Sequence, residues 1–425
     1  MKVDLTLKNC RIWDKKRITK AGLVIDKGRI VSITKSKLPP SKKKIDCKGR
    51  IVLPGLIDVH VHFREPGLNH KEDWLTGSRA AAKGGITYVM DMPNTVPPTL
   101  TLRDLFDKKE LAKKSVVNFG LYAGISQNNL NDLKELSKQA VAFKLYMSES
   151  TGDLTIDNIS LLIKAFANVA RTKRVLSVHA ENEKMNKFCY KDFKKETDPM
   201  AYARSRPPES EVLAINDAIE LAKQTDVKLH ICHVSTKDGL TLIKRAKKNK
   251  VDVTCETCPH YLFMTEEDLK EKITFAKVNP PLRTEKDQKA LWKGIKSGII
   301  DILASDHAPH TLEEKYQNIW FAPAGVPGVE TTLQLMLNAV NKKMIKFEKI
   351  LELMHDNPVK RFGLENYGNI EIGNDANLTV IDLNKKWKIS NEELLTKCKW
   401  SSYEGWEGKG MAVMTVVNGE LKYSY

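Results

Sequence analysis

Short apolar runs alternate with amphipathic segments through the middle of this 425-residue chain. Runs that predict strands lie at 51–60, 86–92, 116–123, 140–147, 174–180, 227–234, 251–257 and 299–305. Helical periodicity follows several of them, over 72–83, 156–171, 209–223, 240–248 and 331–341. Eight strand–helix units in series predict an α/β fold, a parallel (β/α)8 TIM barrel.

Both ends of the chain show a different pattern, in which short strands alternate with turns. Apolar positions at 3–7, 23–25 and 30–33 predict strands near the start, and 378–381 and 413–417 do so near the end. Asp26-Lys27-Gly28 and Asn418-Gly419 are hairpin-turn signals, and the basic block 41–44 is expected in a turn. We therefore predict one discontinuous β domain, residues 1–50 and 368–425, beside a barrel domain of residues 51–367.

The formal net charge of +16 at pH 7 comes largely from lysine. Because lysine is dispersed among Glu and Asp, a solvated surface is favoured over a nucleic-acid site, although a positive field would attract an acidic substrate. The chain has no run of 18 or more apolar residues, and its N-terminus lacks the pattern of a signal peptide. A cytoplasmic protein without nucleic-acid or membrane partners is expected.

Seven cysteines are scattered along the chain, which favours reduced thiols over a disulfide framework. Cys255 and Cys258, followed by His260, have the spacing of half a zinc or redox motif. Because no second pair of this kind follows, we interpret both cysteines as small buried residues near a strand end.

Polar side chains collect where the predicted strands end. His60 and His62 lie two residues apart in an extended run, so they point to the same side, and the cation Arg64 continues on that face. The later strand ends carry Asp91, Asn94, Lys144, His179, Glu181, His230, His233, His260, Asp306 and His310. Active sites of such barrels lie at the C-terminal ends of the strands. The joint pattern predicts a metal-dependent hydrolase that handles an anionic substrate.

Lys144 lies within an apolar strand, where a lysine is rarely buried without a function. An ion pair, or a side chain that extends to the barrel mouth, would account for it. Alternatively, burial near cations favours a neutral, nucleophilic amine, which reacts with carbon dioxide to give a carbamate. The two oxygens of a carbamate are able to bridge two metal ions.

Two segments resemble the signature segments of the dihydroorotases, which are cyclic amidohydrolases of the amidohydrolase superfamily: DVHVHFREPG at 58–67 and ASDHAPHTLEEK at 304–315. The segments around Asn94, Lys144, His179, His233 and His260 follow in the family's order. The resemblance covers essentially the whole chain, because a β-sandwich built from both chain ends is also typical of that superfamily.

The resemblance implies a binuclear centre with two zinc ions per chain. The implied metal ligands are His60, His62, Lys144, His179, His233 and Asp306. Lys144 would carry carbon dioxide as a carbamate and bridge both ions. Asp306 would also act as general base and acid.

The resemblance also implies the reversible cyclisation of N-carbamoyl-L-aspartate to L-dihydroorotate, a step of de novo pyrimidine biosynthesis. Arg64, Asn94 and His310 would bind the α-carboxylate of this small-molecule substrate, and Asn279 would contact its ring. A homodimer and an association with aspartate transcarbamoylase are compatible with the resemblance.

This chain departs from some relatives that lack the strand lysine and use a later aspartate. It has both Lys144 and Asp153, and we assign the bridge to Lys144. Asp153 then belongs to a small, polar loop, 148–153, that is a candidate lid. His260 matches a residue that binds a further zinc in some relatives, and we do not assume a third metal here.

Allantoinases and hydantoinases or dihydropyrimidinases share the metal ligands and are the alternative functions. A hydantoin ring has no carboxylate, so the presence of Arg64 and His310 favours a dihydroorotase. A catalytically inactive, dihydroorotase-like scaffold is a further alternative. It is disfavoured because every ligand position is filled.

Overall fold

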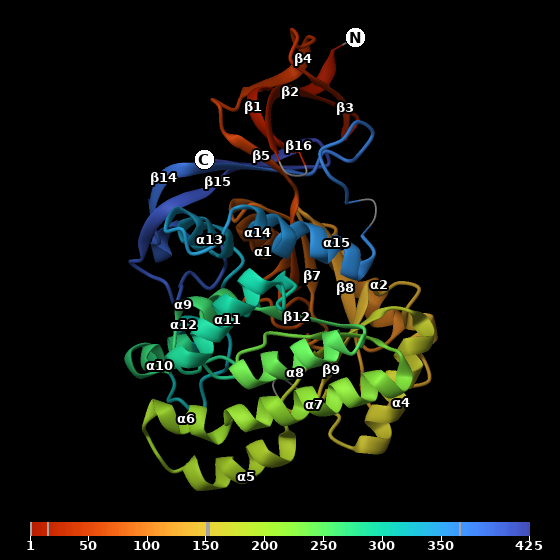
Figure 1. The fold of residues 1–425 in the computed structure, drawn as a ribbon, viewed down its shortest axis with the longest axis vertical. Helices are drawn as coiled ribbons and strands as arrows, with labels where there is room; N and C mark the ends of the chain where they lie inside the picture. The colour runs from red at the N-terminus through yellow and green to blue at the C-terminus, as the bar shows by residue number, and fades with distance from the viewer. Residues whose placement is uncertain (1, 15–16, 150–153, 365–366) are drawn as a thin grey trace.

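The middle of the chain forms a parallel barrel (Figure 1). The computed structural model of the protein describes residues 2–14, 17–149, 154–364 and 367–425. Neighbouring strands follow the chain order: β6 (Leu56–Val61), β7 (Ile86–Asp91), β8 (Asn118–Gly124), β9 (Ala142–Tyr146), β10 (Val175–His179), β11 (Lys228–Ile231), β12 (Val253–Thr257) and β13 (Ile302–Leu303). The two edges of this sheet meet where Val61 pairs with His307, just beyond β13. The predicted (β/α)8 TIM barrel is confirmed.

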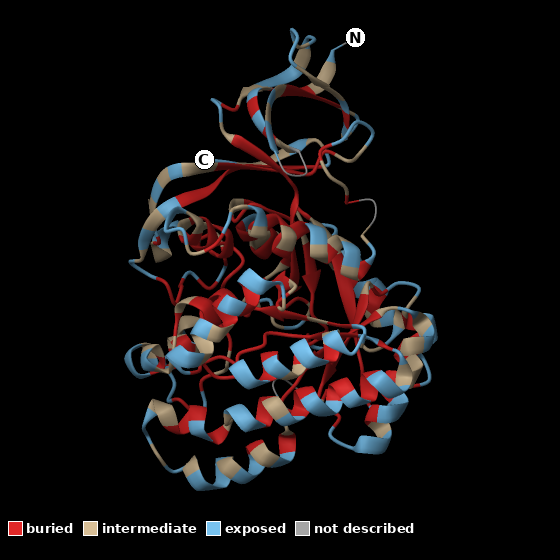
Figure 2. Cartoon of the chain, in the orientation of Figure 1, coloured by how far each residue is buried: buried red, intermediate tan, exposed pale blue. Residues whose placement is uncertain are grey.

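Helices enclose the barrel, with their buried residues towards the strands and their exposed residues outwards (Figure 2). The longer ones are α1 (Trp74–Lys83), α2 (Leu102–Ala112), α4 (Ile159–Thr172), α5 (Glu183–Phe193), α7 (Pro208–Thr225), α8 (Lys237–Lys248), α11 (Glu285–Ser297) and α13 (Thr332–Asn341). The shorter ones are α3 (Leu133–Leu136), α6 (Pro199–Ser205), α9 (Pro259–Phe263), α10 (Glu266–Lys272), α12 (Leu312–Lys315), α14 (Glu348–Leu351) and α15 (Asn357–Phe362). In α4, Leu162, Ala165, Phe166 and Val169 are buried, and their spacing of three and four residues places them on one face.

Strands from both ends of the chain form a second, mixed sheet beside the two termini (Figure 1). Its order is β16 (Glu420–Ser424), β15 (Glu407–Val417), β14 (Leu378–Lys388), β5 (Ile51–Pro54), β1 (Val3–Asp14), β2 (Arg17–Asp26) and β3 (Arg29–Thr34), with β4 (Ser41–Asp46) beside β1. Both predicted hairpin turns occur: φ is 48° and 77° at Lys27 and Gly28, and 49° and 78° at Asn418 and Gly419. Positive φ at both central residues matches the twist of the flanking strands. The smaller discontinuous β domain is thereby confirmed.

Two local predictions were wrong. The expected single strand over 51–60 is divided, because β5 pairs with β1 and β14 in the second sheet while β6 enters the barrel. Gly55 is the joint, and a Cβ there would lie 2.2 Å from Oγ1 of Thr87. The basic block 41–44 is not a turn but part of β4, which pairs in parallel with β1. A strand is compatible with this sequence because the pairing uses only backbone groups and leaves the lysine side chains in solvent. We propose that the barrel domain begins at Gly55, close to the predicted boundary.

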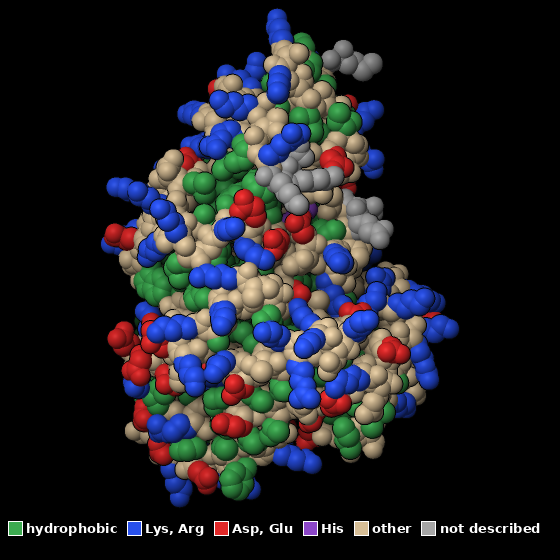
Figure 3. Space-filling view, in the orientation of Figure 1, with side chains coloured by type: hydrophobic (Ala, Val, Ile, Leu, Met, Phe, Trp, Pro, Cys, Tyr) green, Lys and Arg blue, Asp and Glu red, His purple; other side chains and the backbone are tan. Residues whose placement is uncertain are grey.

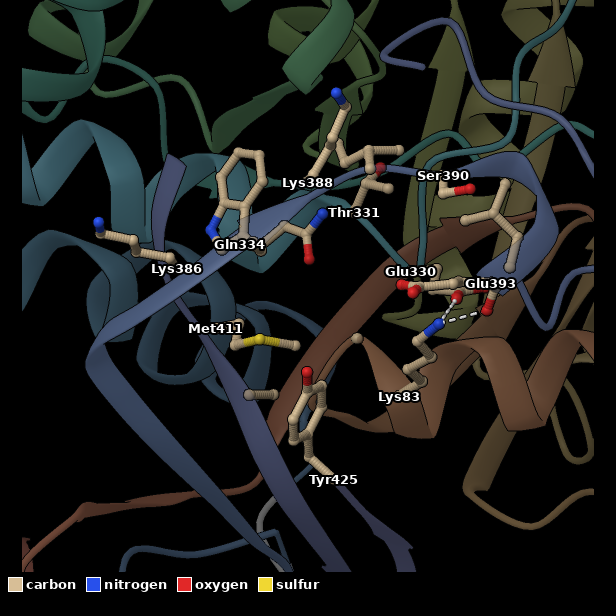
Figure 4. Close-up of a pocket in the computed structure, with 15 residues that line it drawn as sticks. Lys83, Glu330, Thr331, Gln334, Lys386, Lys388, Ser390, Glu393, Met411 and Tyr425 are labelled. Atoms are coloured by element: carbon tan, nitrogen blue, oxygen red, sulfur yellow. Dashed lines mark hydrogen bonds and ion pairs between the residues drawn. The ribbon is translucent and has the colours of Figure 1, made fainter. Parts of the chain in front are cut away.

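The barrel packs against the second sheet through α1, which contacts β15 and β16, and through α13, which contacts β15. Lys83, at the end of α1, pairs with Glu330 (Nζ to Oε1, 2.8 Å) and donates to the backbone carbonyl of Glu393 at 2.5 Å (Figure 4). These groups line a pocket of about 200 Å³, which Trp387 and Met411 complete from β14 and β15. Within its described lining there is no predicted site residue, so the pocket is separate from the predicted chemistry.

Lysine and arginine side chains are dispersed among acidic and polar ones on the face that Figure 3 shows. Some pair with a neighbouring carboxylate on the same helix, as Lys270 does with Glu267 in α10 and Lys289 with Glu285 in α11. This dispersion agrees with the predicted solvated, lysine-rich surface. None of the helices in the described residues has the length and apolarity that a membrane crossing needs.

Candidate active site

The predicted metal ligands meet at the C-terminal ends of the barrel strands. Oδ1 of Asp306, which follows β13, lies 3.3 Å from Nε2 of His60 and 3.1 Å from Nε2 of His62. At the ends of β10 and β11, Nδ1 of His179 lies 3.1 Å from Nε2 of His233. The rings of His60 and His233 connect the two groups, with 5.4 Å between their centroids. The structure therefore brings these histidines and Asp306 into one ligand cluster.

Lys144, in β9, is fully buried beside the ligand cluster. Its Nζ lies 3.1 Å from Sγ of Cys232 and 5.1 Å from the centroid of the Tyr146 ring. Burial lowers the pKa of His233 and of His179, and the charge of Lys144 lowers both further. Within the described residues no carboxylate oxygen lies within 4.0 Å of this Nζ, so an ion pair does not account for the burial of Lys144.

Glu256, in β12, is a buried carboxylate behind His60 that the sequence reasoning missed. It accepts hydrogen bonds from Nδ1 of His60 at 2.5 Å and from Nε2 of His230 at 3.0 Å, and the former bond directs Nε2 of His60 towards Asp306. Burial and Lys144 would lower the pKa of His60, but Asp306 and Glu256 outweigh them and raise it to about 10. Two carboxylates around one buried imidazole form a site that favours positive charge. The predicted strand 251–257 contains two acidic residues, and the one near its C-terminal end, Glu256, was the available signal.

Further polar partners fix the orientation of the other ligand rings. Nε2 of His179 lies 2.8 Å from Oε2 of Glu181, so its Nδ1 faces the ligand cluster. Nδ1 of His62 lies 2.6 Å from Oδ1 of Asn94, so this predicted substrate residue contacts a predicted metal ligand. Nδ1 of His233, by contrast, is buried without a hydrogen-bond partner in the described structure.

Three site residues share a strained backbone. The φ angle is 65° at Arg64, 36° at His233 and 46° at Asp306, in the left-handed region that residues other than glycine rarely adopt. Each lies two or three residues beyond the end of a barrel strand. Strain of this kind persists where the surrounding structure enforces it, and it concentrates at functional sites. No sequence pattern predicted it.

The donor atoms of the ligand cluster fit a metal centre. The ligand atoms of His60, His233 and Asp306 lie within 4.8 Å of one another, and so do those of Cys258, His260 and Asp306. Imidazole and carboxylate donors are the ones that zinc accepts. Cys258 is buried as predicted, but it lies near Asp306, and Nε2 of His260 is buried with no partner in the described part of the chain. The residues that could hold a metal therefore extend to His260.

A group of basic side chains lies beside the ligand cluster. Nη2 of Arg64 is 3.0 Å from Nε2 of His310, and Nζ of Lys71 is 3.2 Å from the other ring nitrogen. Nε of Arg64 donates to the backbone carbonyl of Pro309. Among the described residues no carboxylate oxygen lies within 4.0 Å of the buried guanidinium, whereas Lys71 pairs with Glu314. The arrangement can bind an anion, and the sequence reasoning missed Lys71.

The predicted ring contact, Asn279, lies in a cavity of about 480 Å³. Tyr202 donates a hydrogen bond to its Oδ1. Arg206, Lys277 and Trp320 also line this cavity. Residues 150–153, which include Asp153 and most of the candidate lid, lie outside the described residues.

Comparisons with known proteins relate the whole chain to one family. The model of the amidohydrolase family matches residues 51–422. The chain is 41% identical over 414 residues to a dihydroorotase of Methanosarcina mazei, covering 95% of this chain and 90% of the relative. It is 40% identical over 414 residues to a dihydroorotase of Methanosarcina acetivorans, covering 95% and 88%. Among solved structures, the L-hydantoinase (dihydropyrimidinase) of Arthrobacter aurescens matches with a TM-score of 0.95 and 33% identity, covering 99% of this chain and 96% of that one.

Proposed function

Because the chain belongs to the amidohydrolase family and, within it, to the dihydroorotases, we propose that the ligand cluster is the active site of a dihydroorotase. The enzyme closes N-carbamoyl-L-aspartate to L-dihydroorotate and, in reverse, opens the ring by hydrolysis. The observation that carries the proposal is the buried guanidinium of Arg64, which has no carboxylate partner among the described residues. The α-carboxylate of the substrate supplies that partner, in a bidentate geometry that guanidinium groups favour.

We propose that the ligand cluster holds two zinc ions. The ligands would be His60, His62 and Asp306 for one ion and His179 and His233 for the other. Lys144 would bridge both ions as a carbamate, formed when its amine adds to carbon dioxide and releases a proton. When bound, zinc supplies a water with a pKa of about 7 and polarises the reacting carbonyl. The support from the chain is the donor set and the buried amine of Lys144, which donates to Sγ of Cys232 and has no carboxylate partner among the described residues.

Asp306 would move the proton of the reaction. Burial would raise the pKa of its carboxyl group, but His60 and His62 outweigh burial and hold the pKa well below the usual value. The group is therefore ionised at neutral pH, which is the form that a general base requires. In ring opening it would take a proton from the attacking water and give it to the ring nitrogen as the carbon–nitrogen bond breaks.

Ring closure would use the same carboxylate in the opposite sense. The ureido nitrogen attacks the side-chain carboxylate of carbamoyl aspartate, and Asp306 takes a proton from that nitrogen. Asp306 then returns the proton to the departing oxygen, which leaves as water after a second proton arrives from solvent. We assign Arg64, Asn94 and His310 to the α-carboxylate and Asn279 to the ring.

A hydantoinase is the second candidate function, because the L-hydantoinase structure matches nearly the whole chain. A ring without a carboxylate would leave the buried charge of Arg64 without a partner, which is unfavourable. The deciding experiment compares carbamoyl aspartate, dihydroorotate, dihydrouracil and hydantoin as substrates of one zinc-loaded preparation whose metal content is measured. Turnover of the first two alone is expected. Preferential turnover of hydantoin would contradict our proposal and support a hydantoinase instead.

Other properties rest on the sequence or on the resemblance alone. A cytoplasmic location, a homodimer and an association with aspartate transcarbamoylase stay predictions. The same holds for the lid over 148–153 and for any metal at His260.

A further inference from the structure

Two buried lysines near the proposed substrate site have no carboxylate partner among the described residues. Lys277 lines the cavity that contains Asn279, and Lys315 lies near Arg64 and His310. Lys277 is 4% exposed and Lys315 is 0% exposed. In the described ranges of the chain no carboxylate oxygen lies within 4.0 Å of either Nζ. Burial of an ammonium group without a compensating charge is unfavourable unless its hydrogen bonds are satisfied, so both positions require an explanation.

The hydrogen bonds of both lysines go to one stretch of backbone, residues 319–325, which we call the 319–325 segment. Nζ of Lys277 donates to the carbonyl oxygens of Ile319 at 2.6 Å and Ala322 at 2.5 Å. Nζ of Lys315 donates to those of Pro323 at 2.9 Å and Gly325 at 3.1 Å. The segment contains no helix or strand of its own. Its carbonyl groups are therefore held by side chains from outside it.

The other side of the 319–325 segment contacts the substrate-binding region. The carbonyl oxygen of Ala324 lies 3.1 Å from Nε2 of His310, the same ring nitrogen that faces Arg64. Gly325 packs so closely that a Cβ would lie 2.6 Å from the carbonyl oxygen of Ala308 and 3.1 Å from Nε2 of His310. Residues 320–324 also line the cavity that contains Asn279. The segment is thus a wall shared by both halves of the proposed substrate site.

We propose that Lys277 and Lys315 are positioning residues that hold the 319–325 segment against His310 and so set the geometry of the carboxylate-binding group. The inference rests on the proposed function. The electrostatics agree with it, because burial, Lys277 and Arg64 together hold the pKa of Lys315 well below its usual value. Burial likewise lowers the pKa of Lys277, to about 7. Neutral or charged, each amine retains N–H groups that can donate to the carbonyls.

The variants Lys277→Met and Lys315→Met keep the side-chain length and remove the donors. In the cyclisation of carbamoyl aspartate we expect each to raise KM about tenfold or more, with kcat changed less than about threefold. The matched control is Lys270→Met, which removes an exposed lysine that pairs with Glu267 and should leave both constants unchanged. A fall in kcat as large as the rise in KM would indicate a general structural defect and would overturn the proposal.

A double-mutant cycle tests whether Lys315 acts through His310. If it does, Lys315→Met should lose most of its effect on KM in a His310→Ala background, because the group that it positions is gone. If the effects of Lys315→Met and His310→Ala on the free energy of substrate binding are purely additive, the proposal is overturned. Wild-type turnover of carbamoyl aspartate tests the proposed function separately, so failure of one inference is distinguishable from failure of the other.

Hydrogen exchange of the wild-type protein gives a test that does not depend on folding of the variants. L-dihydroorotate should slow exchange of the amides in the 319–325 segment, because a bound carboxylate would stabilise the contact between Ala324 and His310. Exchange that is unchanged by saturating dihydroorotate would contradict the positioning role, whether or not either lysine variant folds.

Discussion

The guanidinium of Arg64 lies 3.0 Å from Nε2 of His310, although both side chains are buried and one is a permanent cation. Burial holds the pKa of His310 well below its usual value, and Arg64 and Lys71 lower it further. The ring is therefore neutral at physiological pH, and it lies between two cations. The positive charge of Arg64 and Lys71 therefore favours binding of an anion. A site for a neutral ring would not need these charges.

The bidentate geometry of the Arg64 guanidinium should contribute more to substrate binding than its positive charge does. Arg64→Lys keeps a cation but loses the bidentate geometry, and we expect KM for carbamoyl aspartate to rise about 10- to 100-fold, as for the loss of one charge-assisted hydrogen bond. The change in kcat should be smaller, because the ligand cluster is not altered. Steady-state kinetics in both directions measure this. A variant with the wild-type KM would show that the carboxylate binds elsewhere.

Lys144 should be required for metal binding as well as for activity. Lys144→Ala removes the amine that would become the bridging carbamate, so we expect less than one tenth of the activity and a reduced zinc content. Short carboxylic acids should restore part of both, since a carboxylate offers the same two oxygens. Zinc is measured on the protein before the assay. Asp153→Ala is the control, and an inactive Asp153→Ala with an active Lys144→Ala would reverse the assignment of the bridge.

Glu256 should tune the affinity of the centre without touching the substrate. Glu256→Gln replaces the carboxylate that accepts from Nδ1 of His60 by a neutral amide, and partners of this kind typically contribute 10- to 100-fold in metal affinity. We therefore expect zinc to be lost to a chelator at a concentration lower by about that factor. Glu267→Gln, at an exposed position of α10, should behave as the wild type. Unchanged zinc affinity would mean that His60 does not depend on Glu256 for its orientation.

Local periodicity predicted the site residues that are encoded within single segments. Alternation in a strand was sufficient to place His60 and His62 together, and the positions of His179 and His233 at strand ends were sufficient to bring them near. Glu256 was missed because its contact with His60 joins residues 196 positions apart across the barrel. The periodicity of an apolar strand does not indicate which interior residue faces a ligand.

The division of the first predicted strand was missed for a related reason. Apolar residues run through 51–57, across the end of β5 and the start of β6, so hydrophobicity could not distinguish β5 in the second sheet from β6 in the barrel. The distinction comes from tertiary pairing with β14 and from the close approach of Thr87 to Gly55. Lys277 and Lys315 were missed similarly, since their partners are carbonyl groups of an irregular segment.

The stability of the protein should depend on pH through Glu211, which lies outside the ligand cluster. Burial raises the pKa of Glu211 to about 7, and the opposing effects of Arg283 and Ser235 do not offset it. The folded state therefore keeps a proton between pH 4.5 and 7 that the unfolded chain has released. Stability from this group is fully present below pH 4.5 and is lost as the pH rises to about 7.

Glu211→Gln should remove this dependence, because the amide mimics the protonated acid and can still accept from the backbone amide of Ser235. We expect the difference between the variant and the wild type to be smallest near pH 5. Near pH 8 the variant should exceed the unfolding free energy of the wild type by up to about 3 kcal/mol, since each unit of pKa shift corresponds to 1.4 kcal/mol. Urea unfolding at four pH values from 5 to 8, with zinc removed from both proteins, measures the difference between the two curves. Parallel curves would show that Glu211 ionises at its usual pH in the folded protein, with Arg283 compensating for its burial.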